Sequence, residues 1–220
     1  MEENKLIIIT GPTASGKTAL AMKIAEKENK AVISADSRQV YKYLNIGTAK
    51  PTAEEQKKIK HHLVDIITPE NQYNAGRFLD DSQLIVFQYY QEQKPLPIIA
   101  GGTGLYIKSF TEGLAEIPDI PENIVHQLSK IAKSQGLDTL YEQLRQIDPE
   151  AADSIHSNDK QRIIRFLSVY LFTRKTYTSF LKIQEKPKYP FYITQILFLP
   201  DREELYEKIN NRVDMMIEKG

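Results

Sequence analysis

The stretch Gly11-Pro12-Thr13-Ala14-Ser15-Gly16-Lys17-Thr18 decides the fold class of this chain of 220 residues. It matches the phosphate-binding pattern G-x-x-x-x-G-K-[ST] at every fixed position. Residues 6–9 before it form a continuous apolar run, as expected of a buried parallel strand, and residues 19–28 after it carry apolar side chains at helical spacing. A strand, a glycine-rich loop and a helix in this order predict a P-loop and disfavour the alternative of a purely structural glycine turn.

A P-loop binds phosphate mainly through its backbone. The glycines let amide N–H groups approach phosphate oxygens, and the N-terminus of the following helix adds a positive dipole end. Lys17 would supply a positive charge for the outer phosphate, and the hydroxyl of Thr18 is a candidate ligand for Mg²⁺, which usually keeps several of its waters. The pattern is typical of ATP-binding and other nucleotide-binding proteins. It leaves open hydrolysis, phosphoryl transfer and the use of a diphosphate as a leaving group.

Further strands and helices alternate along the first half of the chain. Apolar runs at residues 31–35, 63–67 and 97–100 predict buried strands, and residues 78–90 predict an amphipathic helix. This alternation predicts an α/β fold of the P-loop kinase-like class, in which helices flank a parallel sheet.

The alternation of predicted strands and helices stops after Gly113. Residues 119–159 contain no convincing strand, and residues 124–131 and 137–147 predict short helices. Residues 160–182 predict a longer helical stretch that is basic. We therefore expect a first part of the core at residues 1–117, a helical insertion at 118–158, and a return to the core at 159–220 through the basic helix, a strand at 191–199 and a C-terminal helix from residue 201.

The composition excludes several classes of protein. The 29 basic residues balance 29 acidic ones, so a partner with many phosphates requires a local basic patch. The absence of cysteine excludes disulfides, thiolate metal sites and cysteine nucleophiles. The adjacent His61 and His62 have no third ligand near them in the sequence, which disfavours a metal site. The N-terminus predicts neither a signal peptide nor a membrane span, so we expect a cytoplasmic protein with no membrane partner.

Polar side chains follow two of the predicted strands. Asp36 comes directly after the second strand, and Thr103 lies in the glycine-rich turn after the strand at residues 97–100. Because ligands of open α/β sheets bind outside the carboxyl ends of the strands, both are candidates for the site, although the turn also needs its glycines for conformational reasons. Asp36 suits three roles: a ligand of Mg²⁺-bound water, a general base, or the N-cap of a helix that begins at the next residues. Its neighbours Ser37, Arg38 and Gln39 offer donors suited to a base edge or a phosphate, which favours a functional role.

The basic stretch at residues 160–182 contains no acidic residue. A run of charge is usually a solvated helix face, but the complete absence of acids favours an anionic partner. Arg162 and Arg165 are three residues apart and therefore share a helix face.

Seven segments occur in a fixed order over residues 11–216: GPTASGKT, SADSRQVY, NIGTAKP, HHLVDI, AGGTGLYIKS, DPEAADSIHSNDKQRIIR and INNRVDMM. As an ordered set they resemble the tRNA dimethylallyltransferases, also called tRNA isopentenyltransferases. The resemblance is specific because ordinary P-loop kinases do not share the set. Members of this family transfer a dimethylallyl group from dimethylallyl diphosphate to N6 of adenosine 37 in tRNA, and they usually continue beyond the end of this chain, so we expect a C-terminally shortened member.

The resemblance implies a role for each matching residue. The P-loop would hold the diphosphate leaving group, with Mg²⁺ as cofactor at Thr18, while Lys17 and Arg212 neutralise its charge. Asp36 would be the general base toward the adenine amino group, and Thr13 would line the channel near the reacting atoms. The implied partners are dimethylallyl diphosphate and the anticodon stem-loop of tRNA, bound by a monomer. The residues implied to contact tRNA are Asp36, Ser37, Arg38, Gln39, Thr103, Gln161, Arg162, Ile163, Ile164 and Arg165.

Three other functions fit parts of the sequence. An adenylate isopentenyltransferase would act on free AMP, ADP or ATP, and the basic helix disfavours so small an acceptor. A nucleotide or metabolite kinase normally carries several arginines on a mobile lid, whereas residues 119–159 contain the single arginine Arg145. A non-catalytic module that binds nucleotides or RNA is the third alternative.

Overall fold

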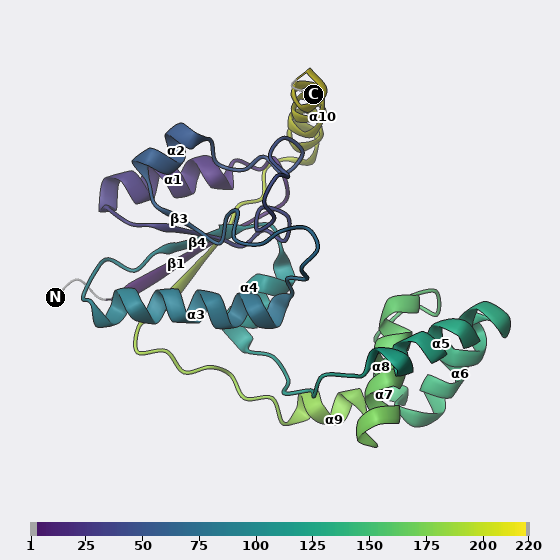
Figure 1. Cartoon of the computed structure of the whole chain (residues 1–220). Coiled ribbons are helices and arrows are strands. Elements are labelled where there is room, and N and C mark those ends of the chain that lie inside the picture. The colour runs from purple at the N-terminus through teal and green to yellow at the C-terminus, as the bar shows by residue number, and fades with distance from the viewer. Residues whose placement is uncertain (1–3, 219–220) are drawn as a thin grey trace. The chain divides into compact units, whose positions relative to one another are not determined.

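The computed structural model describes residues 4–218, which form two compact units (Figure 1). Unit 1 combines the chain up to Gly113 with the segment that starts at Lys186, and unit 2 is Leu114–Glu185. None of the helices in the described range is long and apolar enough to cross a membrane.

Unit 1 is built on a parallel sheet of five strands in the order β3-β2-β4-β1-β5. Ile7 and Ile8 of β1 pair with Ile98 and Ile99 of β4, and β5 pairs on the other side of β1. The strand residues Ile8, Ile9, Ile33, Ile98 and Ile99 are fully buried, as the continuous apolar runs predicted. The strands are β1 (Lys5–Thr10), β2 (Val32–Ser34), β3 (His61–His62), β4 (Ile98–Gly101) and β5 (Tyr192–Leu197).

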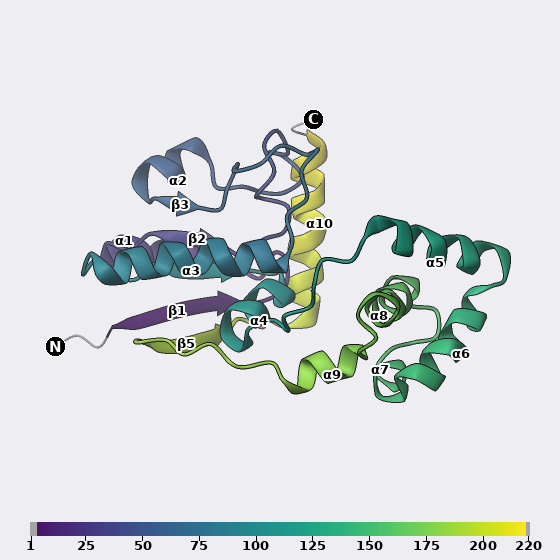
Figure 2. The same ribbon diagram turned by 60° about the horizontal axis from the view of Figure 1, so that its bottom comes forward.

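Helices cover both faces of this sheet, so the predicted α/β fold with a parallel sheet is confirmed. Helix α1 lies over one face, and α3 and α4 lie over the other (Figure 1). Helix α10 stands beside the end of the sheet at which β1 ends (Figure 2). The helices of unit 1 are α1 (Lys17–Glu28), α2 (Ala53–Lys58), α3 (Ala75–Gln91), α4 (Gly104–Glu112) and α10 (Arg202–Glu218).

Unit 2 is entirely helical in its described elements. Its core is formed by buried apolar side chains of four helices, among them Leu128, Leu140, Ala152, Ile163 and Leu167. The helices are α5 (Glu122–Ser134), α6 (Leu137–Ile147), α7 (Pro149–Asp153), α8 (Lys160–Thr173) and α9 (Tyr177–Lys182).

The predicted return to the core at residue 159 is wrong, because α8 and α9 belong to unit 2. The apolar stripe of α8 packs on α5 and α6 through Ile163 and Leu167. Helix α9 is fastened by the buried Asp148, whose carboxylate accepts hydrogen bonds from Thr178 N (2.9 Å) and Thr178 Oγ1 (2.7 Å). The chain therefore returns to unit 1 only at Lys186.

Backbone conformations explain two further differences from the predicted elements. The strand expected at residues 63–67 is replaced by the shorter β3, because Leu63 (φ 60°) and Asp65 (φ 55°) interrupt the extended backbone. The helical stretch expected at residues 160–182 is divided into α8 and α9 at Arg174, which adopts a left-handed conformation (φ 58°).

Candidate active site at the carboxyl edge of the sheet

Three loops meet where β1, β2 and β4 end. The turn after β2 is joined to the loop after β4 by hydrogen bonds from Ala35 N to Ala100 O (2.8 Å) and from Thr103 N to Ala35 O (3.1 Å). Ser37 N also donates to Thr103 Oγ1 (2.9 Å). The structure therefore brings Asp36 and Thr103 to one edge, as predicted from their positions at the carboxyl ends of two strands.

Gly101 is essential to this junction. A Cβ atom at position 101 would lie 2.1 Å from Ala35 O and 2.3 Å from Ala35 C, and both are backbone atoms that cannot move aside independently. At Gly104, by contrast, an added Cβ atom meets nothing within 4 Å.

We therefore expect Gly101→Ala to lower the free energy of unfolding by about 1–3 kcal/mol, the usual consequence of overpacking. Gly104→Ala is the matched control, and its stability should stay near that of the wild type. Urea unfolding of both variants measures the difference. Equal midpoints for Gly101→Ala and the wild type would show that the two loops are not in close contact.

The P-loop is built as an anion site. Helix α1 begins after Gly16 (φ 94°), with no side chain capping its N-terminus and no acidic residue in its first turn. The first N–H groups of a helix lack intrahelical partners, so they remain for a ligand. The Ser15 hydroxyl is buried and has no hydrogen-bond partner within the described part of the chain. Thr13 and Thr18 have exposed side chains on the same loop.

The segment after β5 closes one side of this loop. Phe198 N donates to Thr10 O (2.8 Å), and a Cβ atom at Gly11 would lie 2.4 Å from Phe198 O. Only glycine therefore fits at position 11. Sequence reasoning missed Phe198, because its contact is made by the backbone and leaves no side-chain signature.

The charges of Asp36 and Arg212 both act on the Lys17 ammonium. Its Nζ donates a hydrogen bond to Pro12 O (2.8 Å), a backbone carbonyl of the P-loop itself. Burial lowers the pKa of Lys17 below its ordinary value, the negative charge of Asp36 opposes this effect, and the positive charge of Arg212 adds to it. The structure thus brings Lys17, Asp36 and Arg212 close enough to interact electrostatically, although Arg212 comes from α10, far away in the sequence.

The two carboxylate oxygens of Asp36 have different surroundings. Oδ1 accepts hydrogen bonds from Arg38 N (2.8 Å) and, at longer range, from Gln39 N (3.4 Å). Residues 37–40 form a turn and not the helix that the capping interpretation assumed, so Asp36 caps a turn. Oδ2 has no hydrogen bond within the described residues and remains available to a substrate.

The other residues implied to contact tRNA divide into exposed and buried ones. Arg38 in unit 1 and Gln161, Arg162 and Arg165 in unit 2 are exposed. Arg162 Nε lies 3.5 Å from Asp159 Oδ2, an exposed pair of little energetic weight. The side chains of Ile163 and Ile164 are in the core of unit 2, which leaves only their backbone for a tRNA contact.

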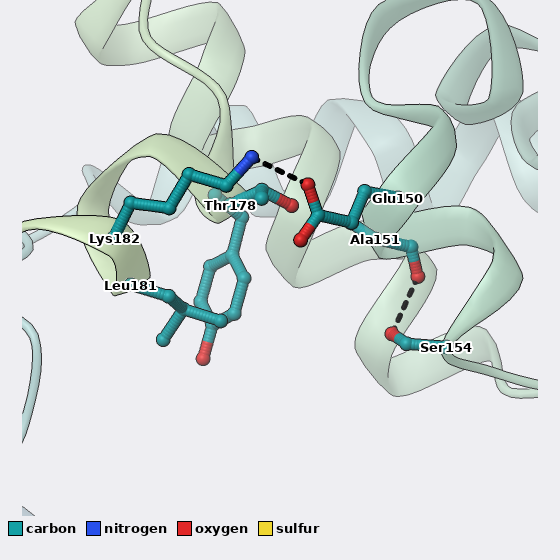
Figure 3. Close-up of a pocket in the computed structure, with 7 residues that line it drawn as sticks. Glu150, Ala151, Ser154, Thr178, Leu181 and Lys182 are labelled. Atoms are coloured by element: carbon teal, nitrogen blue, oxygen red, sulfur yellow. Dashed lines mark hydrogen bonds and ion pairs between the residues drawn. The ribbon is translucent and has the colours of Figure 1, made fainter.

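A separate pocket of about 220 Å³ lies on unit 2 (Figure 3). Lys182 Nζ and Glu150 Oε2 form an ion pair at its rim (2.6 Å), and Ser154 Oγ donates to Ala151 O. None of the predicted site residues lines it. Its lining is Glu150, Ala151, Ser154, Tyr177, Thr178, Leu181 and Lys182.

Comparison with known proteins identifies the family. The sequence profile of the family described as IPP transferase matches residues 39–220. The tRNA dimethylallyltransferase of Acetivibrio thermocellus is 43% identical over 220 residues, covering 99% of this chain and 69% of the relative. That of Carboxydothermus hydrogenoformans is 44% identical over 218 residues, covering 98% and 70%. The chain thus spans a little over two thirds of these relatives.

Solved structures agree with this result. The full-length tRNA isopentenylpyrophosphate transferase of Bacillus halodurans has a TM-score of 0.63 and 36% identity, covering 99% of this chain and 67% of that one. A eukaryotic dimethylallyltransferase solved acting on tRNA has a TM-score of 0.82 and 29% identity, covering 99% and 54%. The chain therefore belongs to the IPP transferase family, the prenyltransferases that include the tRNA dimethylallyltransferases.

Proposed function

We propose that this protein transfers the dimethylallyl group of dimethylallyl diphosphate to N6 of adenosine 37 in the anticodon stem-loop of tRNA, as a monomer. The observation that carries the proposal is that the uncapped N-terminus of α1 and Lys17 lie beside the loop after β4, which hydrogen bonds join to the Asp36 turn. An anion site beside a carboxylate suits a reaction in which a diphosphate leaves while a proton is removed, and the positive charge of Arg212 acts on the same Lys17. The names of the relatives supply the acceptor, tRNA.

Asp36 would act on the acceptor. The exocyclic amine of adenine is a poor nucleophile because its lone pair is delocalised into the ring. A carboxylate oxygen within about 3 Å would take the amine proton as the new C–N bond forms. Oδ2 of Asp36 suits this role because Oδ1 already accepts the backbone N–H groups of its own turn. The adenine must leave its stack to reach Asp36, so we expect base flipping.

The P-loop would act on the leaving group. Negative charge builds on the diphosphate as the allylic carbon becomes cationic, and Lys17 and Arg212 would stabilise that charge. The orphan hydroxyl of Ser15 and the uncapped N-terminus of α1 supply further donors. Thr13, exposed on the same loop, would line the channel near the reacting carbon.

Mg²⁺ fits the same loop as a cofactor. The exposed hydroxyl of Thr18 is the protein oxygen that would hold it, and the diphosphate and waters would complete the coordination. This arrangement requires no cluster of carboxylates, and no group of three or more His, Cys, Asp or Glu side chains suited to a metal occurs among the described residues. When bound, the ion would neutralise charge on the departing diphosphate.

The exposed Arg162 and Arg165 of α8 allow the proposed binding of tRNA to be tested. If Arg162 and Arg165 contact phosphates, changing both to Gln should weaken tRNA binding. It should also flatten the dependence of log K on log[salt] by about one unit per lost contact. Binding of dimethylallyl diphosphate should not change, since the P-loop belongs to unit 1. The measurement is a salt titration of tRNA binding by the wild type and the double variant.

Arg145→Gln is the matched control, because Arg145 is an exposed arginine of the same unit that pairs with Glu142. It should leave the salt slope unaltered. Melting curves separate a loss of contact from a loss of stability. Equal slopes for the double variant and the wild type would show that these arginines do not contact tRNA phosphates.

A further inference from the structure

Both polar atoms of the Gln39 side-chain amide make hydrogen bonds within the protein. Its Oε1 accepts a hydrogen bond from Ser34 Oγ (2.8 Å), at the end of β2. Its Nε2 donates to Thr48 O (3.2 Å) and Ala49 O (3.0 Å). A glutamine amide has two N–H donors, and both are occupied here. A hydrogen bond donated by this amide to tRNA would therefore require at least one of the bonds from Nε2 to break.

The loop that Gln39 holds, residues 42–50, is itself fastened firmly. The side chain of Lys50 is 5% exposed, and its Nζ donates to Tyr41 O (2.6 Å), Asn45 Oδ1 (3.0 Å) and Asp65 Oδ1 (2.6 Å). Asp65 N in turn donates to Gln39 O (3.0 Å). The carbonyls of Thr48 and Ala49 are thus fixed acceptors, because a buried ammonium with three partners restrains the loop that carries them.

Gln39 also lies in the turn that follows Asp36. Its backbone N–H, together with that of Arg38, points to Asp36 Oδ1. Displacing Gln39 would therefore displace the partners of that carboxylate. We propose that Gln39 is a positioning residue, which couples strand β2 and the 42–50 loop to the Asp36 turn and so aims Asp36 Oδ2 at the acceptor amine. The expected effect of this coupling on catalysis rests on the proposed function.

Gln39→Met tests the coupling, because it keeps the length of the side chain and removes the amide. We expect kcat to fall by about 10- to 100-fold, since a misplacement near 1 Å can cost about 100-fold. The KM values for tRNA and dimethylallyl diphosphate should not change. Ser34→Ala removes one of the three hydrogen bonds of the Gln39 amide, the one that Ser34 Oγ donates to Oε1. Ser34 is a buried residue, 5% exposed. Ser34→Ala should lower kcat less, and add nothing in the Gln39→Met background, because its partner is already gone.

Gln56→Met is the matched control. Gln56 is an exposed glutamine whose Nε2 donates to the backbone oxygen of Pro51 (2.9 Å), without any bond to the Asp36 turn. Its kcat should equal that of the wild type. A raised KM for tRNA with kcat preserved in Gln39→Met would overturn the inference in favour of a direct tRNA contact. Lowered thermal stability with both kinetic constants preserved would overturn it in favour of a purely structural role.

Hydrogen exchange provides a readout that does not depend on catalysis. The amide hydrogens of Arg38 and Gln39 should exchange faster in Gln39→Met than in the wild type or Gln56→Met, because the turn loosens. Unchanged exchange would contradict the coupling whatever the activity. If the wild type transfers no prenyl group to tRNA, the proposed function fails, and the exchange rates still decide whether Gln39 holds the Asp36 turn.

Discussion

Asp36→Asn is expected to lower turnover by about 10²–10⁴-fold, the usual contribution of a general base. The amide oxygen of Asn can still accept the hydrogen bonds from Arg38 N and Gln39 N, so the turn should persist while the base is lost. Binding of pyrophosphate should stay nearly intact. The measurement is single-turnover prenyl transfer at saturating substrates, with pyrophosphate binding followed by calorimetry.

Asp36→Ala separates the two roles of this carboxylate. It removes both the base and the acceptor for the turn, so it should lower activity as much as Asp36→Asn and also lower the melting temperature. If Asp36 only held the turn, Asn would preserve the rate and Ala would not. A wild-type rate in folded Asp36→Asn protein would therefore rule out general-base catalysis by Asp36.

Lys17→Ala should weaken both binding and catalysis. A hydrogen bond to a charged group contributes about 1.5–3 kcal/mol, which corresponds to pyrophosphate binding that is about 10- to 100-fold weaker. Transfer should fall by about 10²–10³-fold, because the lost donor also stabilises charge that develops on the leaving group. Dimethylallyl diphosphate should lose affinity to the same degree as pyrophosphate, since the loop binds phosphate and not the prenyl tail.

Lys23→Ala is the control for this prediction, because Lys23 is an exposed lysine on the same helix α1. It changes the net charge equally and should leave pyrophosphate binding unaltered. Calorimetric titration of both variants with pyrophosphate gives the comparison. Undiminished binding by Lys17→Ala would show that the loop does not hold the diphosphate in the way proposed.

Much of unit 1 could be predicted because its signals are local. The apolar run of β1, the glycine pattern after it and the amphipathic helix that follows each specify their own structure within a few residues. The division of the chain into units could not be predicted in the same way. The basic residues of α8 are conspicuous in the sequence. However, α8 belongs to unit 2 because Ile163 and Leu167 pack on α5 and α6.

Only part of the geometry of the candidate site could be predicted from the sequence. Their places at the carboxyl ends of two parallel strands predict that Asp36 and Thr103 lie at one edge, whereas a role for Arg212 followed only from the resemblance to a family. No sequence pattern shows whether a polar side chain is already satisfied inside the protein. The amide of Gln39 is such a case, because its partners Thr48 and Ala49 contribute backbone carbonyls that any residue would offer.

The central claim is prenyl transfer to tRNA, and a labelled-donor assay tests it most directly. The protein is incubated with labelled dimethylallyl diphosphate and Mg²⁺, and with unmodified tRNA, AMP or ATP in parallel reactions. We predict that label enters tRNA, that it is found at N6 of adenosine 37, and that tRNA with guanosine at position 37 takes up none. Label on AMP or ATP but not on tRNA, or no transfer to any acceptor, would contradict the account.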